Sequence, residues 1–165
     1  LNNKGNTMFI FGDLLEIKDG TICHQVNMHG VMGAGIAYFL AQKYPGLEQA
    51  YKDYIEDFKE NNGKHWKKLI LGTVFYYQVD ADLCIANCFS QFSHELHETL
   101  TSYDSIIKCF DNVRDIVGDA APVYIPFQYG SGIAGGNWLI CQEIAKDFDM
   151  TIVARTSDYE KWLNK

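Results

Sequence analysis

The stretch that decides the fold is residues 21–37, TICHQVNMHGVMGAGIA. Residues 21–26 form a β-prone run, and Gly30, Gly33 and Gly35 follow directly before a helical pattern. Glycine permits positive φ and close backbone approach, and the first turn of a helix presents unpaired N–H groups. Such a loop can bind a phosphate group. A tight strand-to-helix turn without any ligand is the alternative that this stretch alone leaves open.

A second glycine-rich loop, YGSGIAGGNW at residues 129–138, also follows a predicted strand and precedes a predicted helix. In an open α/β sheet, ligands bind beyond the carboxyl ends of the strands, so both loops should open on the same edge. Two such loops predict a site that holds a diphosphate from two sides.

Strands and helices alternate along the chain. The sequence predicts strands over residues 8–11, 21–26, 69–79, 83–86, 123–125 and 151–154. It predicts helices over residues 35–44, 47–58, 102–117, 138–148 and 157–163, the last with Ser157 as its N-cap. This order indicates an α/β domain with helices on both faces of a largely parallel sheet. We expect a single domain over residues 8–165, preceded by an N-terminal extension or cloning remnant at residues 1–7.

The net charge of the chain indicates which kinds of binding partner are unfavourable. The chain has 14 Lys and Arg against 21 Asp and Glu, a formal charge of −7. This is the wrong sign for a surface that follows a nucleic-acid backbone, so we expect no general nucleic-acid binding. A bound anion must be held by local groups. Because no run approaches the roughly 20 apolar residues that cross a bilayer, we also expect no membrane association and a cytoplasmic location.

A nicotinamide-dependent enzyme is the first alternative to weigh, because Gly130, Gly132 and Gly135 match the G-x-G-x-x-G pattern. That pattern normally opens a dinucleotide-binding fold, whereas here only about thirty residues follow it. Asp149 precedes its strand and Asp158 follows it by several residues, so neither is well placed for a ribose. A P-loop is absent from the sequence as well.

These features together resemble the macro domains, and among them the branch of ADP-ribose-1″-phosphate phosphatases and ADP-ribosyl hydrolases. The resemblance covers nearly the whole chain, from Met8 to about Trp162. Its specific pieces, in order, are GDLL at residues 12–15, VN at 26–27 with GVMGAGIA at 30–37, IANCF at 85–89, and IP at 125–126 with GSGIAGGNW at 130–138.

The resemblance implies a three-layer α/β/α sandwich with a mixed, largely parallel central sheet. It implies that Asp13 accepts a hydrogen bond from the adenine amino group, which would select adenine over a base with a carbonyl there. A turn-stabilising role for Asp13 is the alternative. The implied ligand-binding set is Asp13, Leu14, Asn27, Met32, Gly33, Ala34, Gly35, Ile36, Gln91, Ser131, Gly132, Ile133, Ala134 and Gly135, mostly through backbone N–H groups in the two loops.

Two residues are the candidates for catalysis under this resemblance. Asn27 would lie near the distal ribose, where its amide can bridge two hydroxyls, or it could simply tie its loop to the strand. Histidine as a residue type changes its charge near neutral pH, which makes His29 a candidate for proton transfer at the anomeric carbon. An exposed loop histidine without a role is the alternative for His29.

The sequence also departs from parts of the family pattern. Residues 87–93, NCFSQFS, contain no lysine, and Ala134 or a neighbouring glycine stands where some relatives carry an aspartate, so lysine-adduct chemistry is not expected. His94 and His97 do not form H-E-x-x-H, and the five cysteines lie in apolar runs, which predicts reduced structural thiols and no metal site. Gln91 and Ser93 are candidate ribose or phosphate contacts.

The function that follows is binding of ADP-ribose, with hydrolysis of a derivative at the distal ribose by a positioned water. We expect no cofactor, and as partners ADP-ribose, an ADP-ribosyl derivative, or an ADP-ribosylated protein or nucleic-acid end. Positioning and charge stabilisation supply most of the acceleration in such transfers, so little protein chemistry is needed. A module that binds ADP-ribose without catalysis is therefore the second hypothesis.

Overall fold

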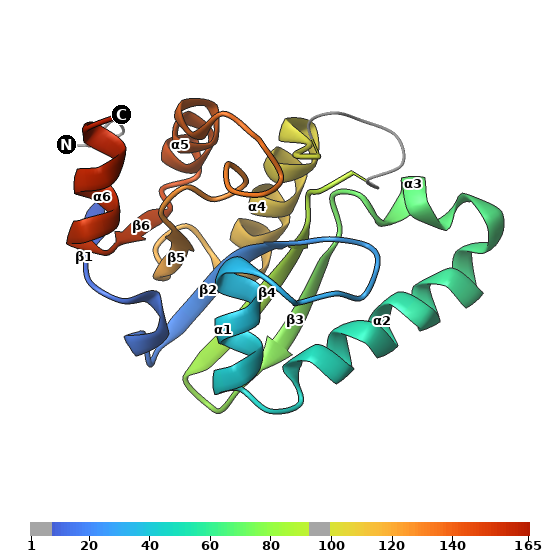
Figure 1. Ribbon diagram of the computed structural model, residues 1–165. Helices are drawn as coiled ribbons and strands as arrows, with labels where there is room; N and C mark the ends of the chain where they lie inside the picture. The colour runs from blue at the N-terminus through green and yellow to red at the C-terminus, as the bar shows by residue number, and fades with distance from the viewer. Residues whose placement is uncertain (1–7, 93–99) are drawn as a thin grey trace.

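The computed structural model describes residues 8–92 and 100–165 (Figure 1). Six strands form one sheet in the order β1-β6-β5-β2-β4-β3. They are β1 (Phe9–Phe11), β2 (Gly20–Val26), β3 (Val74–Gln78), β4 (Leu83–Phe89), β5 (Val123–Pro126) and β6 (Thr151–Ala154). Neighbouring strands are parallel except β3 and β4, which are antiparallel. The mixed, largely parallel sheet is confirmed.

Helices cover both faces of this sheet and complete three layers (Figure 1). They are α1 (Gly35–Lys43), α2 (Leu47–Asn62), α3 (Trp66–Ile70), α4 (Tyr103–Val117), α5 (Trp138–Asp147) and α6 (Thr156–Leu163), with short 3-10 turns η1 (Leu14–Glu16) and η2 (Gly63–His65). Side chains of β2 alternate between the layers: Cys23 packs in the core with α4 and α5, and Val26 packs in the core with α1 and α2. The α/β/α sandwich is confirmed.

Two element predictions were wrong in detail. The apolar run at residues 69–79 begins with the end of α3, because Ile70 is fully buried there, and β3 starts only at Val74. Between them Gly72 has a φ of +87° and the Thr73 hydroxyl donates to the Ile70 carbonyl, which closes a turn. Ser157 is not an N-cap, because α6 begins at Thr156 and Arg155 occupies the cap position without a side-chain hydrogen bond that caps the helix.

None of the helices in the described part of the chain is long and apolar enough to cross a membrane. The expected cytoplasmic location stays a prediction. The five cysteines are free thiols, and all but Cys84 are buried.

One buried ionisable group makes the stability depend on pH. His24 is fully buried in β2, and its Nε2 lies 2.6 Å from Oδ1 of Asn87 on β4. Burial lowers the pKa of His24 from its ordinary 6.5, and the bond to Asn87 only partly opposes this. Below about pH 6.5 the unfolded chain therefore binds a proton that the folded chain does not.

We expect the free energy of unfolding to fall with decreasing pH in that range, with a slope of up to about 1.4 kcal/mol per pH unit from this residue. His24→Gln keeps a donor for Asn87 and removes the titration. Urea unfolding between neutral and mildly acidic pH should give a smaller slope for this variant than for the wild type. Equal slopes would show that His24 does not set the dependence.

Candidate functional site

The two glycine-rich loops lie at the same edge of the sheet. β2 and β5 are parallel neighbours, so the loop after β2 and the loop after β5 both leave from carboxyl ends. β1 and β6 are parallel to β5 and to each other, and they bring the segments after them to this edge as well. The topology therefore places four strand ends around one region, as the sequence predicts for the two loops.

Three adjoining cavities form a cleft along this edge. We call them the Asp13 cavity (about 230 Å³), the central cavity (about 290 Å³) and the Asn27 cavity (about 400 Å³). Gly35 lines both the Asp13 cavity and the central cavity. Ala34 and Ile133, one from each loop, line both the central cavity and the Asn27 cavity. The cleft is thus continuous, and the two loops form opposite sides of it.

The first loop ends in a helix start without a side-chain cap. α1 begins at Gly35, whose φ is +58°, and the preceding Ala34 has no side-chain acceptor to offer. Within the described residues, the N–H groups at positions 33–36 have no hydrogen-bond acceptor. Gly33 and Ile36 also line the cleft. This side of the cleft therefore presents unpaired amides and the positive end of a helix dipole.

The second loop presents a matching set of amides. In the described part of the chain, the N–H groups of Gly132, Ile133 and Ala134 have no acceptor, and all three residues line the cleft. The loop carbonyls are paired instead, since Gly132 O accepts from Gly135 N at 3.0 Å and Ala134 O from Leu100 N at 2.9 Å. Consecutive amides exposed in this way form a concave site for an anion.

Two hydrogen bonds to the carbonyl of Gly130 stabilise the conformation of this loop. It accepts hydrogen bonds from Gly136 N at 2.9 Å and from the hydroxyl of Thr101. A Cβ on Gly136 would lie 2.4 Å from that carbonyl oxygen, so the loop requires glycine there. Gln25 Nε2 donates to the Thr101 hydroxyl oxygen at 3.2 Å, and Gln25 also lines the central cavity.

Asp13 lies at the far end of the cleft and has two contacts. Its Oδ1 accepts from Leu15 N at 2.9 Å and caps η1, which is the turn-stabilising role considered for it. Its Oδ2 lies 3.2 Å from Arg155 Nη2. Asp13 and the buried Leu14 both line the Asp13 cavity. The carboxylate is therefore held in place by the turn and still borders the cavity.

The side chain of Asn27 is hydrogen-bonded within its own loop. Its Oδ1 accepts from His29 N at 2.9 Å, and its Nδ2 donates to Val31 O at 2.7 Å. The Tyr51 hydroxyl donates to the same Oδ1 at 2.9 Å, and burial raises the pKa of Tyr51 far above neutrality, so it remains a donor. These bonds agree with the role of tying the loop to its strand. Asn27 still lines the cavity named after it.

Four predicted contacts lie outside the linings of the three cavities. Met32 is 2% exposed and packs in the core with α1 and α2, because an apolar side chain at that point of the loop turns inward. Ser131 turns away, since its N–H and hydroxyl both donate to Gln128 O. The N–H of Gly135 donates to the Gly132 carbonyl and closes the turn. His29 is exposed on the first loop. Ser93, His94 and His97 fall outside the described residues.

Other residues of the cleft were missed by sequence reasoning. Gln91, a candidate ribose or phosphate contact, lines the central cavity. Phe127 and Gln128, just before the second loop, line it too and were not predicted. Arg155 and Asp158 line the Asp13 cavity, although the distance of Asp158 from its strand counted against a ligand role. Their position after β6, at the shared strand edge, is the signal that could have indicated them.

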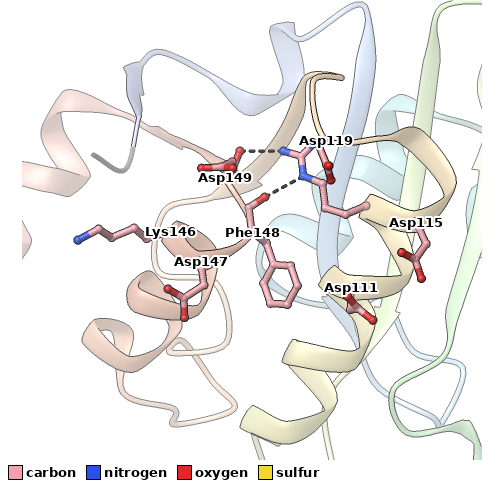
Figure 2. A pocket seen from close by; sticks show the side chains of 8 residues that line it. Asp111, Asp115, Asp119, Lys146, Asp147, Phe148 and Asp149 are labelled. Atoms are coloured by element: carbon pink, nitrogen blue, oxygen red, sulfur yellow. Dashed lines mark hydrogen bonds between the residues drawn. The ribbon is translucent and has the colours of Figure 1, made fainter. Parts of the chain in front are cut away.

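A separate cavity of about 430 Å³ lies at the amino edge of the sheet, between the ends of α4 and α5 (Figure 2). Five aspartates surround it, so it would repel a diphosphate. Its buried Arg114 is committed to the backbone: Nε donates to Phe148 O and Nη2 to Asp149 O, both at 2.8 Å. Arg114 thus fastens α4 to the turn after α5, and this cavity is not the anion site.

Comparison with known proteins agrees with this geometry. No family model matches the chain. An ADP-ribose 1″-phosphate phosphatase from Saccharomyces cerevisiae (strain YJM789) is 26% identical over an alignment of 168 positions, gaps included, that covers 87% of this chain and 93% of that protein.

Solved structures give the same result. A protein of unknown function from Bacteroides thetaiotaomicron superposes with a TM-score of 0.74 at 25% identity, covering 91% of this chain and 97% of that one. A macrodomain protein from Streptomyces coelicolor gives 0.70 at 23% identity, covering 91% and 98%. The chain therefore has the macrodomain fold, and the resemblance found in the sequence is confirmed.

Proposed function

We propose that the cleft binds ADP-ribose, with adenine in the Asp13 cavity, the diphosphate in the central cavity and the distal ribose in the Asn27 cavity. The observation that carries this proposal is the two sets of amides, at residues 33–36 and 132–134, on opposite sides of one cleft, which have no acceptor among the described residues. They explain how a chain with a formal charge of −7 can hold a dianion. A carboxylate at one end gives the ligand a direction.

Ligand-induced stabilisation tests this proposal. At about 100 times its dissociation constant, a ligand stabilises the folded state by roughly 2.7 kcal/mol, which corresponds to a Tm increase of about 5–10 °C for a chain of this size. ADP-ribose should give such a shift, and AMP and ATP smaller ones. A shift with NAD that exceeds the shift with ADP-ribose would favour a nicotinamide-dependent enzyme instead.

We further propose hydrolysis of an ADP-ribose derivative at the distal ribose, with ADP-ribose-1″-phosphate as the first substrate to test. The support is the phosphatase relative and the position of the Asn27 cavity at the end of the cleft where the leaving group would emerge. An ADP-ribosylated protein or nucleic-acid end could present its group there. No cofactor is required, since a positioned water is the nucleophile.

A non-catalytic ADP-ribose-binding module is the second candidate. Two observations favour it: the side chain of Asn27 is bonded within its own loop, and His29 lies outside the three cavity linings. This candidate predicts tight binding of ADP-ribose without turnover.

Phosphate release from ADP-ribose-1″-phosphate separates the two candidates. The catalytic proposal predicts release by the wild type, and at least a tenfold slower release by His29→Ala at unchanged ADP-ribose affinity, because a general acid or base contributes about that much or more. Equal rates for the two proteins would remove His29 from the mechanism. Binding without any release would establish the binding module.

A further inference from the structure

Gln128 has an unusual backbone conformation for its residue type. Its φ is +63°, and among the described residues only Asp149, with a φ of +53°, is another non-glycine in the left-handed region. The carbonyl of Gln128 accepts from Ser131 N at 3.0 Å and from the Ser131 hydroxyl at 2.9 Å, so the turn holds this conformation. A residue with a Cβ is disfavoured there relative to glycine, and such positions cluster at functional sites.

Gln128 lies where two parts of the cleft meet. It lines both the Asp13 cavity and the central cavity. It is half-buried, and its amide has no hydrogen-bond partner within the described residues. Gln128 therefore brings to the cleft wall a side chain whose donor and acceptor have no partner among the residues that the structure describes.

The order of the cavities identifies what would lie beside this amide. In the proposed binding mode, adenine occupies the Asp13 cavity and the diphosphate occupies the central cavity. The group that connects them in ADP-ribose is the adenosine ribose, which carries two adjacent hydroxyls. A side-chain amide can accept from one hydroxyl and donate to the other.

We propose that Gln128 is a specificity-determining residue, which recognises the hydroxyls of the adenosine ribose and selects ribose over 2′-deoxyribose. This inference rests on the proposed binding of ADP-ribose. It accounts for a strained glutamine at a position where glycine would suit the backbone better, because the side chain has a use in the ligand complex.

The test compares ADP-ribose with its analogue that lacks the 2′-hydroxyl of the adenosine ribose, by isothermal titration calorimetry. The wild type is expected to bind ADP-ribose about five- to tenfold more tightly than the analogue, the size expected for one hydrogen bond in an open cleft. Gln128→Leu keeps the side-chain bulk and removes the polar atoms. It should lose that preference and bind both ligands at least as weakly as the wild type binds the analogue, because it also loses the bond to the other hydroxyl.

Gln128→Gly separates ligand recognition from a structural role. Glycine removes the side chain and relieves the positive φ, so this variant should lose the same preference while its Tm stays equal to or above that of the wild type. Asp149→Gly is the matched control, since Asp149 lies outside the cleft. It relieves the same kind of strain and should bind both ligands like the wild type.

The outcomes are distinct. If the wild type does not bind ADP-ribose, the proposed function fails and this inference fails with it. If the wild type binds and Gln128→Leu keeps the full preference for the 2′-hydroxyl, the proposed function stands and the role of Gln128 is wrong. A loss of binding in Gln128→Gly with a matching drop in Tm would also reject the role, because it would show that Gln128 supports the fold.

Discussion

Gly132→Val is expected to abolish ADP-ribose binding without unfolding the protein. A Cβ at Gly132 would meet no atom within 4 Å, and its φ lies outside the left-handed region, so the fold tolerates a side chain there. Gly132 lines the central cavity. The valine methyl groups would occupy space that the diphosphate needs and would keep it from the amides of the second loop.

The expected loss of affinity is at least about 100-fold, or roughly 2.7 kcal/mol, because hydrogen bonds to charged groups contribute about 1.5–3 kcal/mol each. Calorimetric titration with ADP-ribose measures it, and Tm should change by no more than about 2 °C. A graded series strengthens the test: Gly132→Ala should lose less affinity than valine, and Gly132→Glu more, since its charge repels the diphosphate. Wild-type affinity in the valine variant would place the diphosphate elsewhere.

Substitution of Asp13 is expected to remove the preference for adenine. The proposed bond from the adenine amino group to the Asp13 carboxylate cannot form with hypoxanthine, which carries a carbonyl at that position. The wild type should therefore bind ADP-ribose at least about tenfold more tightly than its hypoxanthine analogue. In Asp13→Asn the side-chain amide can turn a donor toward the base, so this preference should fall to about unity or reverse.

Asp13 also caps η1, so two variants are needed to separate the roles. Asn keeps an oxygen for Leu15 N, whereas Ala removes it, at a cost of about 0.5–2 kcal/mol. Asp13→Ala should therefore lower Tm and lose the adenine preference, while Asp13→Asn should lose the preference at a nearly unchanged Tm. A preference that persists in both variants would assign base recognition to another acceptor of the Asp13 cavity, such as the Asp158 carboxylate.

Local sequence predicts that the two glycine-rich loops meet at one edge of the sheet, as they do. Glycines before a helix indicate a turn with exposed amides, and parallel strands bring such turns to one edge of the sheet. The sequence pattern alone therefore predicts that the loop around Gly33 and the loop around Gly132 line the same cleft. The order of the strands did not follow, because pairing of β2 with β4 and β5 is a property of the folded chain.

The missed residues share a different cause. Which amides of a loop turn toward a ligand depends on hydrogen bonds between neighbours, and this is why Ser131 was expected in the cleft and Gln128 was not. No residue-type rule predicts a left-handed glutamine. The prediction of a strand that starts at residue 69 was wrong for a similar reason, because the burial of Ile70 against the helical layer is a tertiary effect.

The central claim is that amides from two separate loops hold one diphosphate. The most direct measurement is a backbone amide NMR titration with ADP-ribose. The amide signals of residues 33–36 and 132–134 should shift together with a single dissociation constant, while Asp119 and Asp147 around the aspartate-lined cavity stay unchanged. Shifts in one loop only, or two different dissociation constants for the two loops, would contradict the account.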